Sequence, residues 1–167
     1  MQTTDTHNKI DYSGRTVDLL LLKTVLGVPV TGERVQVDVT DVSGEPMVVA
    51  GVEKMAQRFL NAFINVLGST RFMADFGTDI IDDVSKGRIY NQATLETAAA
   101  EANMLARKLI VDSDVEYDTP DDEALVSSDV IDLEFSREKA KIKISIKLTT
   151  AAGTSYVYII PVGVGIH

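Results

Sequence analysis

The sequence predicts an α+β fold in which three helices pack against a C-terminal antiparallel β-meander, preceded by an N-terminal β-rich arm. Two patterns predict this class. Apolar residues recur every three or four positions within 52–67 and 95–110, and at every second position within 130–161. The length of 167 residues suits one main core. We place that helix-plus-meander domain at 46–167 and treat 1–45 as a partly flexible arm.

The arm carries strand and turn signals. Valines at every second position from 35 to 39 alternate with polar residues, as in a strand with one buried face. Glycine and proline between 27 and 32 are typical of a turn. The leucine run 19–22 fits either a strand or a short helix, so 17–42 is expected to have β character without a fixed placement.

Three helices are expected in the middle of the chain. The first has one continuous apolar stripe and is expected to end at Gly68, because glycine suits a left-handed C-cap. The second can be capped by Thr78 or Asp79 and is expected to run through Lys86. The third is expected over 94–110, where an alanine-rich face would allow close approach to a neighbouring element.

The acidic residues of the chain gather in two places. A dense group lies within 112–129, and such charge runs usually face solvent, so we expect a loop there with a short strand around 115–117. Asp79, Asp82 and Asp83 share one face of the second helix. The helix dipole explains acids in a first turn, and no calcium-loop spacing is present, so we expect no metal site.

The C-terminal part predicts three antiparallel strands, at 130–135, 140–149 and 154–161. The loop between the first two strands fixes a register. It would place Glu134 opposite Lys141, so that opposite charges pair on one face of the hairpin and aliphatic side chains pair on the other.

The last strand is apolar on both faces. Tyr156, Tyr158 and Ile160 suit the core face, whereas Val157 and Ile159 point the other way. An uncovered strand of this kind promotes aggregation, so it is either covered by segment 17–42 or offered to a partner. We expect these five residues to form a partner-binding site.

Residues suited to catalysis are scarce. The chain has no cysteine, which excludes thiolate nucleophiles, disulfides and zinc–sulfur sites. Its histidines, His7 and His167, lie where a fold would not hold a general base rigidly. We therefore expect no catalytic residue, no metal, no cofactor and no enzymatic activity. A small peptidoglycan hydrolase is the weaker alternative, because it needs a buried acid facing a second carboxylate across a cleft.

The charge of the chain bears on its partners. A net charge of −9 argues against nucleic acid and anionic membranes, since both would repel it. The one basic cluster, within 137–147, lies beside Asp132 and Glu134, which would neutralise it. No signal peptide or membrane-length apolar run is visible, so we expect a soluble protein made in cytoplasm.

Residues 51–81, read with the meander, resemble the baseplate wedge or sheath-initiator family of contractile phage tails and related injection systems. An apolar helix, a Gly-to-Arg connection and an aromatic–Gly pair that opens the next helix form that family's pattern, and the likeness covers residues 45–162. Many relatives carry Glu-Pro-Arg after the long helix, where this chain has Val-Asp-Ser-Asp-Val at 111–115. The resembling segments are Gly51-Val52-Glu53-Lys54-Met55-Ala56-Gln57-Arg58-Phe59-Leu60, Gly68-Ser69-Thr70-Arg71-Phe72 and Asp75-Phe76-Gly77-Thr78-Asp79.

The resemblance implies a structural role in the tail baseplate of a virion, after synthesis in the host cytoplasm. Its implied partners are the tail sheath protein and baseplate wedge proteins, with hub or tube proteins as further candidates, in a symmetric assembly of several copies. Relatives lend strands to the sheath, which implies that the last strand here starts sheath assembly. Another tail scaffold or connector is the main alternative.

The resemblance also implies partner binding by Arg71, Phe76 and Gly77. Each has an alternative that needs no partner. Arg71 could cap a helix end, Phe76 could be a core residue, and Gly77 could supply a positive φ.

Overall fold

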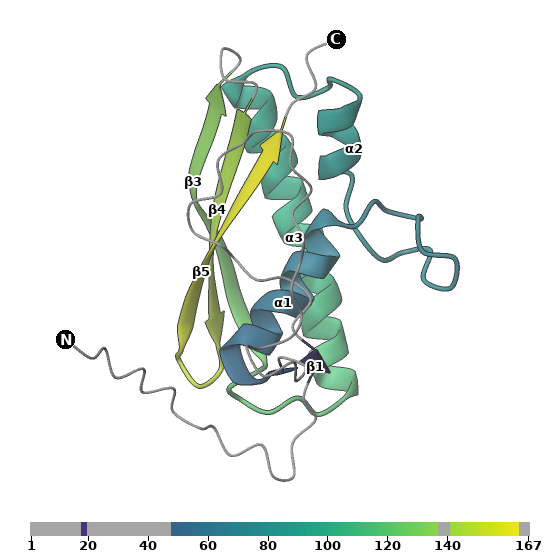
Figure 1. Ribbon diagram of the computed structural model, residues 1–167. Helices are drawn as coiled ribbons and strands as arrows, with labels where there is room; N and C mark the ends of the chain where they lie inside the picture. Colours follow the sequence, from purple (N-terminus) through teal and green to yellow (C-terminus); the bar gives the residue numbers. More distant parts are fainter. Residues whose placement is uncertain (1–17, 20–47, 137–140, 164–167) are drawn as a thin grey trace, which may run out of the picture. The chain divides into compact units, whose positions relative to one another are not determined.

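The computed structural model describes residues 18–19, 48–136 and 141–163 (Figure 1). The chain divides into two compact units, Met1–Ala50 and Gly51–His167. Each unit is described by itself below.

In the first unit, β1 (Asp18–Leu19) pairs antiparallel with β2 (Val48–Val49). The leucine run therefore begins in a strand at Leu19. The remainder of the predicted arm, including the valines at 35–39, lies outside the described residues, as do both histidines.

The second unit is an α+β fold in which three helices precede an antiparallel meander, as predicted. The strands follow each other in space in the order β3-β4-β5. None of the described helices combines the length and the hydropathy needed to cross a membrane. The elements are α1 (Gly51–Ile64), α2 (Ile80–Ser85), α3 (Gln92–Glu116), β3 (Leu125–Ser136), β4 (Lys141–Thr150) and β5 (Ser155–Gly163).

The core lies between the sheet and the two longer helices. Figure 1 shows α1 and α3 on the same face of the sheet, and α2 packs against both helices. The central strand β4 turns four aliphatic side chains toward them, and these are completely buried. Each such side chain contributes roughly 2 kcal/mol by leaving water. They are Ile142, Ile144, Ile146 and Leu148.

Helix α1 buries the stripe that predicted it. Met55, Phe59 and Phe63 are almost fully buried, and the two phenylalanine rings stack with centroids 6.0 Å apart. The helix ends at Ile64, so the prediction that Gly68 is its C-cap was wrong. The Thr78 hydroxyl donates a 2.6 Å hydrogen bond to the carbonyl of Phe63, so a distant residue satisfies this helix end.

Helix α3 begins with a capping box and extends further than predicted. The Asn91 side chain accepts a hydrogen bond from Thr94 N, and the Thr94 hydroxyl accepts one from Asn91 N. The helix continues past Ile110 to Glu116, so the expected loop start at 112 and the strand around 115–117 were wrong. The physical reason is Asp114, which is buried and forms an ion pair instead of facing solvent.

The hairpin register differs from the predicted one by two residues. Glu134 lies opposite Lys143, not Lys141, and Ser136 lies opposite Lys141. Strand β3 ends at Ser136, one residue later than predicted. Over 132–136 the register shift is even, so these side chains keep their predicted face. A β-bulge between Val130 and Asp132 interrupts the pairing, and Ile131, which was expected on the aliphatic face, is 52% exposed.

Candidate partner-binding surfaces

Strand β5 lies at an edge of the meander. Among the described residues its ladder partner is β4, and its other edge pairs with no strand. Tyr158 and Ile160 are buried on the core face. Val157 and Ile159, on the opposite face, are 50% and 36% exposed. The predicted alternative, coverage of this face by 17–42, involves residues outside the described part of the chain.

The position of Pro161 shows which backbone groups of β5 face its open edge. Pro161 lies opposite Lys143 and has no N–H to give to β4, so this pair is of the non-hydrogen-bonded type. Pair types alternate along an antiparallel ladder. The amides of Val157 and Ile159 therefore point toward the open edge, and that of Tyr158 points toward β4.

Acidic side chains of β3 lie beside lysines of β4 on the outer face of the sheet. Lys143 Nζ lies 2.8 Å from Asp132 Oδ2, and this hydrogen bond raises the pKa of Lys143. Lys147 lies opposite Asp129. Within the described part of the basic cluster, the carboxylates of β3 therefore lie beside Lys143 and Lys147.

A second surface is the connection between α1 and α2, which extends away from the helices in Figure 1. We call residues 69–76 the knob. Phe72 is 90% exposed and Met73 is 55% exposed, and the Arg71 guanidinium lies 5.8 Å from the centre of the Phe72 ring. The knob thus carries an apolar tip beside one positive charge.

The base of the knob is held by backbone hydrogen bonds. Thr78 N donates to the carbonyl of Asn65 at 2.8 Å, and Leu67 N donates to that of Thr78 at 3.1 Å. Gly77 has a φ of +114°, and a Cβ there would lie 2.5 Å from the Asn65 oxygen. The sequence alternative for Gly77, a positive φ, is therefore correct, and the knob has a defined base.

The residues that face outward from the knob differ from the predicted site residues. Arg71 is exposed at the tip, Phe76 is half-buried and Gly77 is buried. The two most exposed apolar residues, Phe72 and Met73, were not predicted as site residues. Their signal was two adjacent large apolar residues that belong to neither helical stripe.

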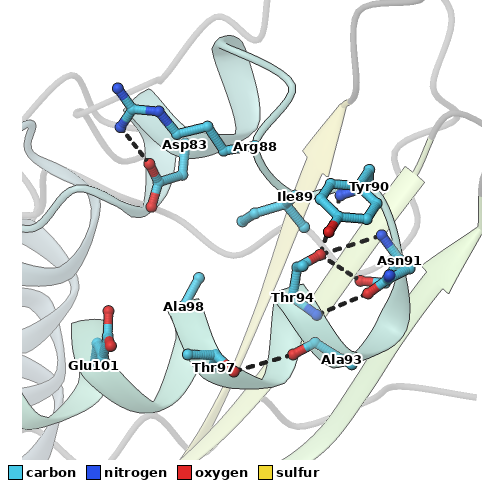
Figure 2. Close-up of a pocket in the computed structure, with 10 residues that line it drawn as sticks. All are labelled: Asp83, Arg88, Ile89, Tyr90, Asn91, Ala93, Thr94, Thr97, Ala98 and Glu101. Carbon is cyan, nitrogen blue, oxygen red and sulfur yellow. Dashed lines mark hydrogen bonds and ion pairs between the residues drawn. The ribbon is translucent and has the colours of Figure 1, made fainter.

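A shallow hollow of about 400 Å³ lies between the segment after α2 and the first half of α3 (Figure 2). Ile89, Ala93 and Ala98 supply its apolar lining. Most of its polar groups are engaged locally: Asp83 pairs with Arg88 at 2.7 Å, and the Asn91–Thr94 capping box occupies one end.

The charges in the hollow divide into a pair and a single carboxylate. The hydrogen bond to Asp83 raises the pKa of Arg88. Figure 2 shows Glu101 on α3, apart from this pair, and Glu101 forms no ion pair with another described residue. This arrangement suits an apolar side chain accompanied by a cation.

Two ion pairs with little solvent exposure join α1 to the end of α3 and to the segment just before β3. Lys54 Nζ lies 2.9 Å from Glu123 Oε2, and Arg58 lies 2.7 Å from Asp114 Oδ1. The second oxygen of Asp114 accepts a 2.8 Å hydrogen bond from Leu125 N. The predicted solvated loop was therefore wrong for Asp114 and Glu123. No histidine or acid cluster within the described ranges is arranged to hold a metal ion.

Comparison of the chain with protein-family models, with curated proteins and with solved structures found no match.

Proposed function

We propose that this chain is a structural component of a contractile-tail baseplate in a virion, and that it starts sheath assembly by pairing the open edge of β5 with a strand of a sheath subunit. The outward amides of Val157 and Ile159 on this edge carry the proposal. The resemblance of residues 51–81 to the sheath-initiator family supports it and points to wedge subunits as further partners.

Pairing at a sheet edge needs backbone geometry and no catalytic group. An added strand gains main-chain hydrogen bonds along β5, and its alternate side chains contact Val157 and Ile159 on the outer face. Tyr158 and Ile160 are buried in the core of this chain. The incoming strand can therefore join without displacing the residues that hold β5 in place.

The sheet presents this edge in a fixed position. The inner face of β4 is fully buried at Ile142, Ile144 and Ile146, and the Arg58–Asp114 ion pair holds α1 against the start of β3. A preorganised edge loses less conformational entropy when a partner binds. This property suits a protein that templates the first ring of an assembly.

The proposal predicts that Ile159→Pro abolishes sheath attachment. Proline removes the outward N–H at this position but no hydrogen bond to β4, so the helices and the meander should stay folded. Ile159→Thr is the matched control, because it keeps the N–H and the β-branched shape. Co-purification with the tail sheath protein of the same virus should fall at least tenfold for Ile159→Pro and much less for Ile159→Thr.

Circular dichroism of both variants checks that the fold is retained. Sheath attachment by folded Ile159→Pro at the wild-type level would contradict pairing through β5. Co-purification of the wild-type chain with the tube protein, and not with the sheath protein, would favour the connector alternative.

A further inference from the structure

We infer that copies of this chain associate head to tail, with the knob of one copy seated in the hollow of the next. The inference commits to a second copy of this chain as the occupant of the hollow. It uses neither β5 nor a sheath subunit, so it stands independently of the proposed function.

The knob has the properties of an inserted anchor. Phe72 is 90% exposed, and Met73 beside it is 55% exposed, so both would leave water on docking. Aromatic side chains that enter a pocket often dominate the binding energy of an interface. The hydrogen bonds at Thr78 hold the base of the knob, which lowers the entropic cost of insertion.

The hollow has a matching size and lining. Sites for small ligands have volumes of roughly 300–1,000 Å³, so a hollow of about 400 Å³ has room for a large side chain. Tyr90, which is 63% exposed, and the side chains of Ala93 and Ala98 offer apolar contacts to the ring. Because Phe72 is 90% exposed, it does not occupy the hollow of its own chain.

The charges of the two surfaces are complementary. Arg71 accompanies Phe72 on the knob, and Glu101 is the carboxylate of the hollow without an ion pair among the described residues. Asp83 already pairs with Arg88. Each chain carries a net charge of −9, so copies repel one another overall, and a specific contact between them requires local opposite charges of this kind.

The symmetry of such a contact follows from its geometry. The knob and the hollow are different surfaces of one chain, so their contact is heterologous and leaves a free knob and a free hollow on every growing chain of copies. Heterologous contacts produce rings when the rotation closes. Head-to-tail association therefore supplies a route to several copies around one axis.

Sedimentation velocity of the full chain over a concentration series tests the inference. Phe72→Ser removes the anchor, and Thr97→Trp fills the hollow from an exposed position on α3. Each should weaken self-association at least tenfold. Val115→Ser, at a side chain that is 81% exposed elsewhere on α3, is the matched control and should associate as the wild type does.

Mixing the two blocked variants gives the sharper test. Phe72→Ser keeps its hollow and Thr97→Trp keeps its knob, so the mixture should form one-to-one pairs and stop there. In a separate experiment, Arg71→Glu and Glu101→Arg should each weaken association, and the double variant should regain it.

Three results would overturn the inference. They are a wild-type chain that stays monomeric up to its solubility limit, undiminished association of Phe72→Ser, and failure of the two blocked variants to pair. Ile159→Pro should self-associate like the wild type, so a failure of β5 pairing and a failure of the knob contact are distinguishable.

Discussion

Asp114→Ala is expected to lower the free energy of unfolding by about 3 kcal/mol. Asp114 is only 8% exposed and accepts hydrogen bonds from Arg58 and from Leu125 N. Its removal leaves a guanidinium and a backbone N–H without this partner in a site that admits little water. The side chain of Arg58 is 21% exposed, so water recovers part of the loss, which places the estimate at the low end for buried pairs.

Urea denaturation followed by circular dichroism measures this change through the shift of the midpoint at constant slope. Asp112→Ala is the matched control, because Asp112 lies on the same helix and is exposed. It should change the unfolding free energy by less than about 0.5 kcal/mol. Equal effects of the two substitutions would show that the Arg58–Asp114 pair does not hold α1 against the sheet.

The fold class could be predicted because the periodic patterns in this chain are long. The stripe of α1 mixes spacings of three and four, as in Ala56, Phe59 and Phe63, which are all buried. A strand would place Ala56 and Phe59 on opposite faces, so only a helix puts the three residues on one side. The alternation along β4 is equally clear. Over 132–136 the register was missed by two residues, because an even shift preserves the face of each side chain there and periodicity alone cannot distinguish the two pairings. The β-bulge before Asp132 has no signal in the alternating pattern.

The buried ion pairs could not be predicted from the acidic run. A carboxylate in solvent and one that anchors a distant helix look alike in sequence when both lie among other acids. The informative signal was in the basic residues that pair with these carboxylates. Lys54 and Arg58 are four residues apart in α1, so both lie on one side of a helix whose neighbouring residues are buried.

The two candidate surfaces also differ in how far the sequence could predict them. The exposed side chains of β5 follow from its alternation, since Val157 and Ile159 must face away from Tyr158. The exposure of Phe72 depends on the hydrogen bonds at the base of the knob, which join Asn65 and Leu67 to Thr78. No local pattern distinguishes a projecting aromatic residue from one that folds back onto a core.

Gly77→Ala is expected to lower the free energy of unfolding by about 3 kcal/mol and to loosen the knob. A Cβ at Gly77 would lie 2.5 Å from the Asn65 oxygen and 3.0 Å from its carbonyl carbon, and the φ of +114° is strained for any L side chain. The Asn65 carbonyl accepts the hydrogen bond of Thr78 N, so it can move aside only by breaking the bond that closes the knob.

Gly87→Ala separates the two sources of strain. Gly87 also has a positive φ, +68°, but a Cβ there would meet nothing within 4 Å. Gly87→Ala should therefore lower the free energy of unfolding only through the strained φ, by about 1–2 kcal/mol. Urea denaturation compares the variants, and trypsin cleavage after Arg71 should accelerate for Gly77→Ala alone, because only that substitution opens the base of the knob. Equal stability loss and equal cleavage in both variants would mean that the close approach at Asn65 does not hold the knob in place.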